Sequence, residues 1–445
     1  MKDIKIGFVP IARVNFDMEL AENTTRRFRE NLEINGLRVI GGEQMITDQH
    51  MAKSAIDRLS KEDLDLLLVF QSTFADSTMI TEIAEGTESP IFLWAVPEAP
   101  TGGRLRLNSL CGINLAAHAL KLRGVPYEYA YADIDNVDAY KKVKAVAAAE
   151  AVEKRLRRAT LGVVGEHPAG MDTCRLDTSG LGAKLGVGVQ TIDLETVFKG
   201  VRSLDPNEIL PVREKLNAVL ENLDELEQAP LSGTLGAYLV LKQLAGQNKL
   251  DGIAVRCWPE FFTDLGCAAC GAISMLTDEG IPCSCEADAN GTITQLILYW
   301  LSDSPAFGTD IVSVDIERDY FIVWHCGLAP LSYADPEFKP RGTIHSNRKL
   351  PLLMEFPLQP GVVTIARLSQ SSGELGLVVG TGEMLSGPIN FSGTSGILRF
   401  KRPTSQVLDT ILSEGLEHHV AVTYGDHSLA LKKLAQRLDL PILEL

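Results

Sequence analysis

The spacing of apolar positions in the first third of the chain predicts short strands that alternate with amphipathic helices. Apolar runs of strand length lie at residues 4–9 (IKIGFV), 65–70 (DLLLVF) and 91–96 (IFLWAV). Helical patterns such as AENTTRRFRENLEI and MAKSAIDRLS separate them. This alternation is typical of βαβ units and a parallel sheet. A long helical stretch rich in Ala, Lys and Glu ends the region.

A second alternating region follows, and the pattern then changes. Strand-like runs at residues 159–165 (ATLGVVG) and 251–257 (DGIAVRC) flank further helical segments. Beyond residue 330, short strands separated by Gly- and Pro-containing turns indicate a small antiparallel barrel or sandwich. We therefore expect an α/β protein with two doubly wound parallel-sheet domains and a smaller β-rich, barrel-like C-terminal domain. The expected domains are residues 1–157, 158–330 and 331–445.

Composition narrows the class of ligand and the compartment. The chain has 445 residues and a formal net charge of −16, which disfavours nucleic acid or an acidic membrane surface as a partner. No apolar run approaches the roughly 20 residues that span a bilayer, and the N-terminus lacks the apolar core of a signal peptide. We expect a cytoplasmic protein that binds a small molecule. The segment GEHPAG, residues 165–170, lacks the glycines of a dinucleotide-binding loop.

Cysteines gather in one part of the sequence. Cys267, Cys270, Cys283 and Cys285 have a spacing that could supply four thiolate ligands to zinc. The surrounding ACGAISMLTDEG has the pattern of a buried helix, in which free cysteine is an ordinary small core residue. We favour core packing and keep the zinc-thiolate site as an alternative.

Residues 283–330 hold the most informative acidic positions. Glu286 and Asp288 come directly before an apolar helical segment, and Asp310 begins the probable strand DIVSVDI. His325 lies near the end of the probable strand YFIVWHCG. Taken singly, Glu286 could cap a helix, Asp310 could be a turn residue, and His325 could be a partly buried histidine with a structural role. Together, two carboxylates and a histidine suit Mn²⁺ or another divalent cation.

The same segment resembles the L-fucose isomerase and L-arabinose isomerase family. The motifs Glu286-Ala-Asp288 and Phe307-Gly-Thr-Asp310 are similar to the two acidic metal-ligand motifs of that family. His325, in WHCG, matches a metal-binding histidine of the arabinose branch. QSTFADSTM and NSLCGINLAAHAL are similar to further family segments.

The C-terminal region extends the resemblance. GLEHHVAVTYGDHSLALKKLAQ looks like the family segment that supplies the last metal ligand, which places His419, or alternatively His418, on the metal. The resemblance implies a manganese-dependent aldose–ketose isomerase that works through an enediolate, without an organic cofactor. Glu286 and Asp310 would be both metal ligands and proton-transfer groups, with His325 a fourth ligand or a hydrogen-bond donor to the sugar. It also implies a homotrimer or homohexamer.

Further candidates for contact with the sugar lie near predicted strand ends. These substrate-binding candidates are Gln71, Arg13, Glu260, Trp324 and Arg256. For each, the structural alternative is a solvated surface residue or an ion pair. Arg13 and Arg256 would suit an anionic substituent on the sugar. Asp288 is expected to support Glu286 as an outer partner.

Two other classes of function remain open from the sequence. Two α/β domains around a cleft would also fit a non-enzymatic sugar-binding protein, although such a protein needs no carboxylate pair with following histidines. An epimerase or aldolase could use the same metal-assisted enediolate chemistry. The reaction product, rather than metal dependence, would separate these enzymes from an isomerase.

Overall fold

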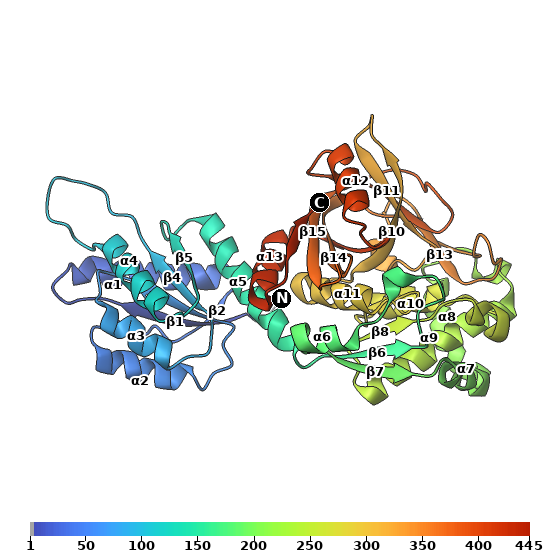
Figure 1. Ribbon diagram of the computed structural model, residues 1–445, viewed down its shortest axis with the longest axis horizontal. Coiled ribbons are helices and arrows are strands. Elements are labelled where there is room, and N and C mark those ends of the chain that lie inside the picture. Colours follow the sequence, from blue (N-terminus) through green and yellow to red (C-terminus); the bar gives the residue numbers. More distant parts are fainter. Residues whose placement is uncertain (1–3) are drawn as a thin grey trace. The chain divides into compact units, whose positions relative to one another are not determined.

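A computed structural model of the chain describes residues 4–445 and divides it into two compact units (Figure 1). The first unit is Met1–Val152 and the second is Glu153–Leu445. Within residues 4–445, no helix has both the length and the apolar character required to traverse a bilayer.

The first unit is a parallel sheet covered by helices on both faces. Its strands, all parallel to their neighbours, run in the order β2 (Arg38–Ile40), β1 (Lys5–Ile11), β3 (Leu66–Gln71), β4 (Ile91–Ala95), β5 (Tyr127–Tyr131). The helices are α1 (Met18–Ile34), α2 (Gln49–Leu59), α3 (Ser77–Glu85), α4 (Ser109–Leu122) and α5 (Val137–Leu156). Alternate strand residues enter two different apolar cores, because successive side chains point to opposite faces of a sheet. Phe70 packs with α1 and α5, whereas Val69 packs with α2, α3 and α4.

The second unit begins with another parallel sheet. Its order is β7 (Gly188–Ile192), β6 (Thr160–Val164), β8 (Gly252–Val255), β9 (Cys283–Ser284). Its helices are α6 (Thr178–Leu185), α7 (Leu194–Ser203), α8 (Pro206–Asn217), α9 (Gln228–Asn248), α10 (Cys270–Asp278) and α11 (Ala289–Ser302). Together with the first unit, this sheet confirms the predicted α/β class with two parallel sheets.

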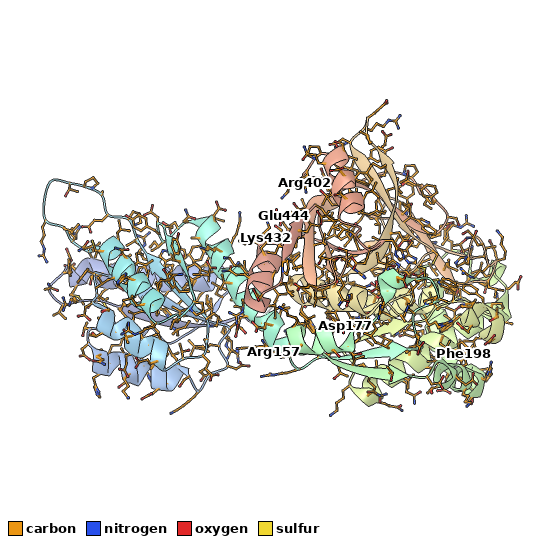
Figure 2. All side chains as sticks on the ribbon, viewed as in Figure 1. Arg157, Asp177, Phe198, Arg402, Lys432 and Glu444 are labelled. Atoms are coloured by element: carbon orange, nitrogen blue, oxygen red, sulfur yellow. The ribbon has the colours of Figure 1, made fainter. Side chains whose placement is uncertain are left out.

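An antiparallel barrel completes the second unit. Its strands follow one another around the ring as β16 (Thr394–Phe400), β11 (Tyr320–His325), β10 (Phe307–Asp315), β17 (His419–Tyr424), β14 (Gly361–Ser369), β15 (Gly376–Leu385). Pairing of β15 with β16 closes the ring. The remaining elements are β12 (Arg341–Thr343), β13 (Leu353–Pro357), α12 (Thr404–Ser413), α13 (Ser428–Leu438) and β18 (Ile442–Glu444). Lys432 on α13 pairs with Glu444 on β18 at 2.8 Å (Figure 2).

The barrel begins earlier in the chain than the predicted boundary at residue 330. The hairpin β10–β11 was expected to belong to a parallel-sheet domain over residues 158–330, but it pairs with β16 and β17 inside the barrel. The reason is that β10 and β11 are antiparallel and find their partners in strands roughly 70 to 110 residues further on, which local patterns do not reveal. Asp310 therefore lies on a barrel strand.

Helix α11 is the element that joins the parallel sheet to the barrel. It packs against β8 on one side and against β14 and β17 on the other, and nearly all of its residues are buried. Its amino-terminal end consequently lies where the carboxyl edge of the sheet meets the barrel. The residues just before this helix are Glu286 and Asp288.

The cysteine-rich segment forms a buried helix, as expected. Cys270 begins α10, and Cys267, Cys270, Cys283 and Cys285 are all buried. Within residues 4–445, clusters of three or more metal-ligating side chains include Cys285 but none of the other three. The four thiols therefore do not form the zinc site that their spacing allowed.

Candidate active site

The turn between β9 and α11 carries Glu286 and Asp288 in a constrained backbone. Glu286 and Ala287 have φ angles of 57° and 54°, in the left-handed region that non-glycine residues seldom adopt. Such residues cost on the order of 1–3 kcal/mol each and gather at functional sites. Asp288 then caps α11 by accepting a hydrogen bond from the Gly291 amide at 2.9 Å. The turn thereby fixes Glu286 above the helix.

Barrel strands bring two more site residues to the same place. Asp310 on β10 is directly opposite His419 on β17 and Trp324 on β11. Side chains of directly opposite residues in antiparallel strands project from the same face. Asp310 and His419, which are 109 positions apart in the chain, therefore lie side by side.

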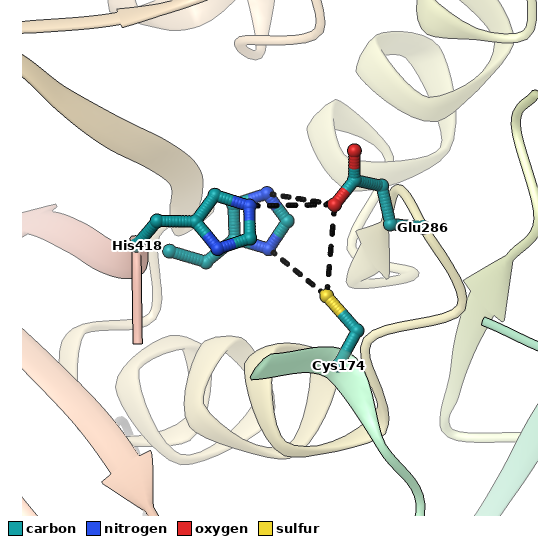
Figure 3. A group of neighbouring side chains, drawn as sticks. Cys174, Glu286 and His418 are labelled. Carbon is teal, nitrogen blue, oxygen red and sulfur yellow. Dashed lines mark hydrogen bonds and ion pairs between the residues drawn. The ribbon is translucent and has the colours of Figure 1, made fainter. Parts of the chain in front are cut away.

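The Glu286 carboxylate lies beside His418 and Cys174 (Figure 3), and His419 lies between Glu286 and Asp310. His419 Nε2 lies 3.4 Å from Asp310 Oδ1 and 3.9 Å from Glu286 Oε2. His418 Nε2 lies 3.3 Å from the same Glu286 oxygen, and its Nδ1 is 2.9 Å from Thr173 Oγ1. Both histidines thus border the Glu286 carboxylate, but His419 lies between the two carboxylates.

Hydrogen bonds keep Glu286 ionised despite its burial. Burial raises its pKa, but the contact with His418, the hydrogen bond from Trp258 Nε1 to Oε1 (3.0 Å) and the charge of His419 outweigh this effect. The resulting pKa of Glu286 is about 2. For His418, burial lowers the pKa, and the contact with Glu286 raises it above its ordinary value. The pair is therefore a carboxylate beside a readily protonated imidazole.

The buried ion pair of Asp288 and Arg367 contacts His419. His419 Nδ1 lies 3.0 Å from Asp288 Oδ2, and Asp288 is paired with Arg367 through both carboxylate oxygens. Burial raises the pKa of Asp288, but Arg367 and His419 together hold it well below its usual range. Glu417 lies on the other side of Arg367, at 4.0 Å from Nε. When His419 is neutral, the ionised Asp288 accepts its Nδ1 proton, and Nε2 is then an electron-pair donor.

The arrangement of donors fits a divalent cation. The Nε2 of a neutral His419 faces oxygens of Glu286 and Asp310, so three electron-pair donors face one another. Within residues 4–445, the buried Oδ1 of Asp310 has no hydrogen-bond donor. The separations of 3.4 and 3.9 Å lie between those of adjacent ligands, about 3 Å, and opposite ligands, about 4.2 Å, around an octahedral ion with bonds of about 2.1 Å. The Asp288–His419 contact is the outer carboxylate–histidine bond typical of metal sites.

His325 lies beside this cluster, with both ring nitrogens engaged elsewhere. Its Nδ1 accepts a hydrogen bond from the Cys326 amide at 2.8 Å, and its Nε2 is 3.0 Å from Cys285 Sγ. Its ring centroid is 5.6 Å from that of His419. Cys174 also borders the site, with Sγ 3.6 Å from Glu286 Oε2. Its thiol pKa is raised, first by burial and then by Asp288 and Glu286.

The predicted substrate-binding residues fall into two groups. Arg256 and Glu260, after β8, form a two-pronged ion pair with both contacts at 2.7 Å. Trp324 stands opposite Asp310 and donates its Nε1 hydrogen to the Ser392 carbonyl at 2.8 Å. These three lie in the second unit with the metal-ligating cluster.

The other two candidates belong to the first unit. Arg13 follows β1 and pairs with Asp76 at 2.8 Å. Gln71 ends β3, is completely buried, and has no hydrogen-bond partner for its amide within residues 4–445. Their part in a sugar site stays a prediction.

Several residues of the site were missed from the sequence. Arg367 is the only charged residue of the apolar strand β14, GVVTIARLS, and this isolated charge was an available signal because such residues are seldom buried unless paired. Trp258 and Cys174 had no comparable signal. Asp288 was expected to support Glu286, whereas its contact is with His419.

Comparisons with known proteins find relatives over nearly the whole length of the chain. The family profile described as "Fucose/sulfoquinovose isomerase, N-terminal domain" matches residues 7–153, and "L-fucose isomerase, C-terminal domain" matches residues 354–445. A sulfoquinovose isomerase of Priestia aryabhattai is 32% identical over 442 residues, covering 99% of both chains. A sulfoquinovose isomerase of Alkalicoccus urumqiensis is 30% identical over 445 residues, again 99% of each.

Fold and site thus define a sugar-converting enzyme of the aldose–ketose isomerase class, as the resemblance predicted. The chain belongs to the fucose/sulfoquinovose isomerase family. This membership favours the enzyme over the sugar-binding alternative. A solute-binding protein of Agrobacterium vitis, solved with tagatopyranose, aligns with 63% of this chain and 91% of its own at 14% identity. Its TM-score of 0.18 is too low to indicate a shared fold.

Proposed function

We propose that this enzyme converts a sulfonated aldose, sulfoquinovose, into its ketose with a divalent cation, Mn²⁺, held by Glu286, Asp310 and His419. The names of the relatives support the substrate. The observation that carries the metal site is that His419 Nε2 lies 3.4 Å from Asp310 Oδ1, a buried oxygen with no hydrogen-bond partner within residues 4–445. When bound, the cation would supply Lewis-acid polarisation of the carbonyl and hydroxyl oxygens of the sugar.

Asp310 is the proposed proton-transfer base. A carboxylate with a pKa of about 2 is a weak base, so Glu286 is better suited to remain an ionised ligand. Asp310 has an oxygen free of hydrogen bonds and can take the proton from C2 of the open-chain aldose. The C2–H electrons then form the C1=C2 bond of an enediolate, and Asp310 returns the proton to C1.

A second proton must move from the C2 hydroxyl to the former carbonyl oxygen at C1. The Glu286–His418 pair is placed for this transfer, because its members are 3.3 Å apart and His418 has a raised pKa. His418 donates a proton to the oxygen at C1, and the neutral imidazole then takes the proton of the C2 hydroxyl, while Glu286 holds the ring in place. His325, with both nitrogens engaged by Cys326 and Cys285, is assigned to supporting the site rather than to a fourth ligand.

The proposal is tested by proton exchange. Protein with Mn²⁺ in D₂O would be incubated with sulfoquinovose and with neutral aldoses, and deuterium entry and ketose formation followed by NMR. Glu286→Gln and Asp310→Asn should each lower turnover by about 10²–10⁴-fold. Asp315→Asn, at the far end of the same strand β10, is the matched control and should behave like the wild type. Retained turnover and Mn²⁺ affinity in both site variants would refute the site.

A homotrimer or homohexamer also remains our proposal. Exposed apolar side chains on α4 support it: Leu110, Leu115 and Leu122 are 51%, 37% and 72% accessible. Sedimentation equilibrium would give the assembly mass, and a monomer at micromolar concentration would contradict the proposal.

A further inference from the structure

A half-buried arginine without a carboxylate partner lies in the loop between β12 and β13. Arg348 Cζ is 4.9 Å from the ring centroid of Trp258 and 5.1 Å from that of Phe262. Within residues 4–445, no carboxylate oxygen forms an ion pair with its guanidinium. Stacking on aromatic rings covers the flat faces of a guanidinium and leaves its N–H edges to bind a ligand.

His345 brings a second donor to the same edge. Its side chain is buried, at 7% accessibility, and its Nδ1 accepts hydrogen bonds from the amides of Asn347 (3.2 Å) and Arg348 (3.3 Å). These bonds place the imidazole proton on Nε2. His345 Nε2 is also 3.2 Å from Arg348 Nη1, so two N–H donors face each other without an acceptor between them. An oxygen that carries negative charge would satisfy both.

Trp258 links this donor pair to the proposed site. The guanidinium of Arg348 stacks on the face of the Trp258 indole, and the Nε1 of the same indole donates a hydrogen bond to Glu286 Oε1 at 3.0 Å. The guanidinium of Arg348 is therefore about one indole width from the Glu286 carboxylate. An extended hexose chain spans a comparable distance, since five C–C bonds reach about 6 Å.

The two arginines predicted from the sequence to bind an anionic substituent, and the buried Arg367, have their charges already paired. Arg256 is bound by Glu260 through two contacts at 2.7 Å, and Arg367 is buried against Asp288. Arg13 of the first unit pairs with Asp76. Arg13 and Arg256 are thus engaged by carboxylates, whereas Arg348, stacked on Trp258, keeps its charge available for a ligand.

We propose that Arg348 and His345 form the subsite for the anionic group on C6 of the sugar, a tetrahedral oxyanion such as a sulfonate or a phosphate. This inference rests on the proposed isomerase function and adds the residues that select its substrate class. One guanidinium and one neutral imidazole N–H match the single negative charge of a sulfonate better than the charge of a phosphate dianion. The subsite orients the chain so that C1 and C2 reach Glu286 and Asp310.

The test compares a charged substrate with its uncharged counterpart. KM and kcat for sulfoquinovose would be measured for the wild type, Arg348→Gln, Arg348→Lys and Arg318→Gln. The inhibition constant of 6-deoxy-D-glucose, which lacks the sulfonate, and that of glucose 6-phosphate would be measured against sulfoquinovose in each. Arg318, exposed beside Asp315 in the β10–β11 turn, is the control for loss of one positive charge.

For Arg348→Gln we expect KM for sulfoquinovose to rise at least tenfold, whereas the inhibition constant of 6-deoxy-D-glucose changes less than threefold. The KM of Arg348→Lys should lie between those of the wild type and Arg348→Gln, because lysine keeps the positive charge but lacks the paired N–H donors of a guanidinium. In the wild type, sulfoquinovose should bind more tightly than glucose 6-phosphate; the reverse order would identify a phosphate as the natural group. Thermal melts establish that each variant is folded.

Two results separate failure of the subsite from failure of the proposed function. Equal weakening of the binding of sulfoquinovose and of 6-deoxy-D-glucose in Arg348→Gln, or an unchanged KM in both Arg348 variants, would overturn the subsite. Neither result would contradict the proposed isomerase function. Wild-type protein that isomerises a neutral aldose and not sulfoquinovose would overturn the proposed substrate and the subsite together.

Discussion

At the residue scale, His419 is oriented as its proposed role of metal ligand requires. Its Nδ1 is turned to the buried Asp288 at 3.0 Å, and its Nε2 is left facing two carboxylates. Asp288 in turn is held ionised by Arg367, which is only 2% accessible. A ligand imidazole oriented by an outer carboxylate has the correct tautomer before any metal arrives.

Replacing Asp288 should therefore weaken metal binding without removing a ligand. We expect Asp288→Asn to lower Mn²⁺ affinity or activity by about 10–100-fold, measured by electron paramagnetic resonance of free Mn²⁺. Asp177→Asn is the matched control, since Asp177 also caps a helix, α6, through a glycine amide but has no histidine contact. Unchanged affinity in Asp288→Asn would mean that His419 is not the ligand.

His345 should make stability fall in acid. Burial and then the charges of Arg348 and His325 lower its pKa to about 4. In the unfolded chain His345 has an ordinary histidine pKa near 6.5. Between about pH 6.5 and 4 it is therefore protonated in the unfolded chain and neutral in the folded chain. The free energy of unfolding should therefore decrease over this window, by up to about 3 kcal/mol from this group.

Chemical denaturation at several pH values in EDTA would check this. His345→Gln should lose less stability than the wild type between pH 7 and 4.5, and His50→Gln, at an exposed position, should match the wild type. Parallel pH profiles for wild type and His345→Gln would contradict the assignment.

At the element scale, α11 and the turn before it determine the site. The helix is buried between β8 and the barrel strands β14 and β17, so its amino-terminal end has little freedom to move. The left-handed conformations of Glu286 and Ala287 then aim the carboxylate at His418 and His419. A buried helix thus makes a strained turn tolerable, since surrounding contacts over-determine its position.

Gly291→Ala should disturb this element from within. A Cβ at Gly291 would collide with Asp288 Oδ2 and lie 3.0 Å from Arg367 Nη1. We expect a lower melting temperature and weaker Mn²⁺ binding, because Asp288 must move away from His419. Gly182→Ala in α6, where a Cβ meets nothing within 4 Å, should instead be neutral or stabilise by about 0.5–1 kcal/mol. Equal behaviour of the two variants would contradict the crowding argument.

At the scale of the whole molecule, the chain consists of two compact units with separate cores. Glu286, Asp310, His418 and His419 all lie in Glu153–Leu445, where the parallel sheet and the barrel share one apolar core. The first unit, Met1–Val152, has its own two cores on the faces of its sheet. The proposed metal ligands therefore depend on the second unit alone.

This division predicts that residues 153–445 fold and bind Mn²⁺ when expressed alone. Calorimetry should give an affinity within about threefold of that of the full chain, since no ligand is lost, and circular dichroism should show cooperative unfolding. The fragment with Asp288→Asn is the control for specific binding. A fragment that is folded but does not bind Mn²⁺ would show that the first unit contributes to the metal site.

Local patterns in the sequence determined the elements and the class of site. Apolar periodicity predicted the two parallel-sheet regions and the barrel, because hydrophobic spacing reflects which face each element buries. The Glu286–Asp288 motif and the late histidines predicted the chemistry through their family resemblance. Tertiary structure alone decided that the β10–β11 hairpin joins the barrel, that Asp288 holds His419, and that Arg348 stacks on Trp258. These contacts depend on strand register and loop packing between residues about 90 to 130 positions apart, and short-range patterns do not encode such pairings.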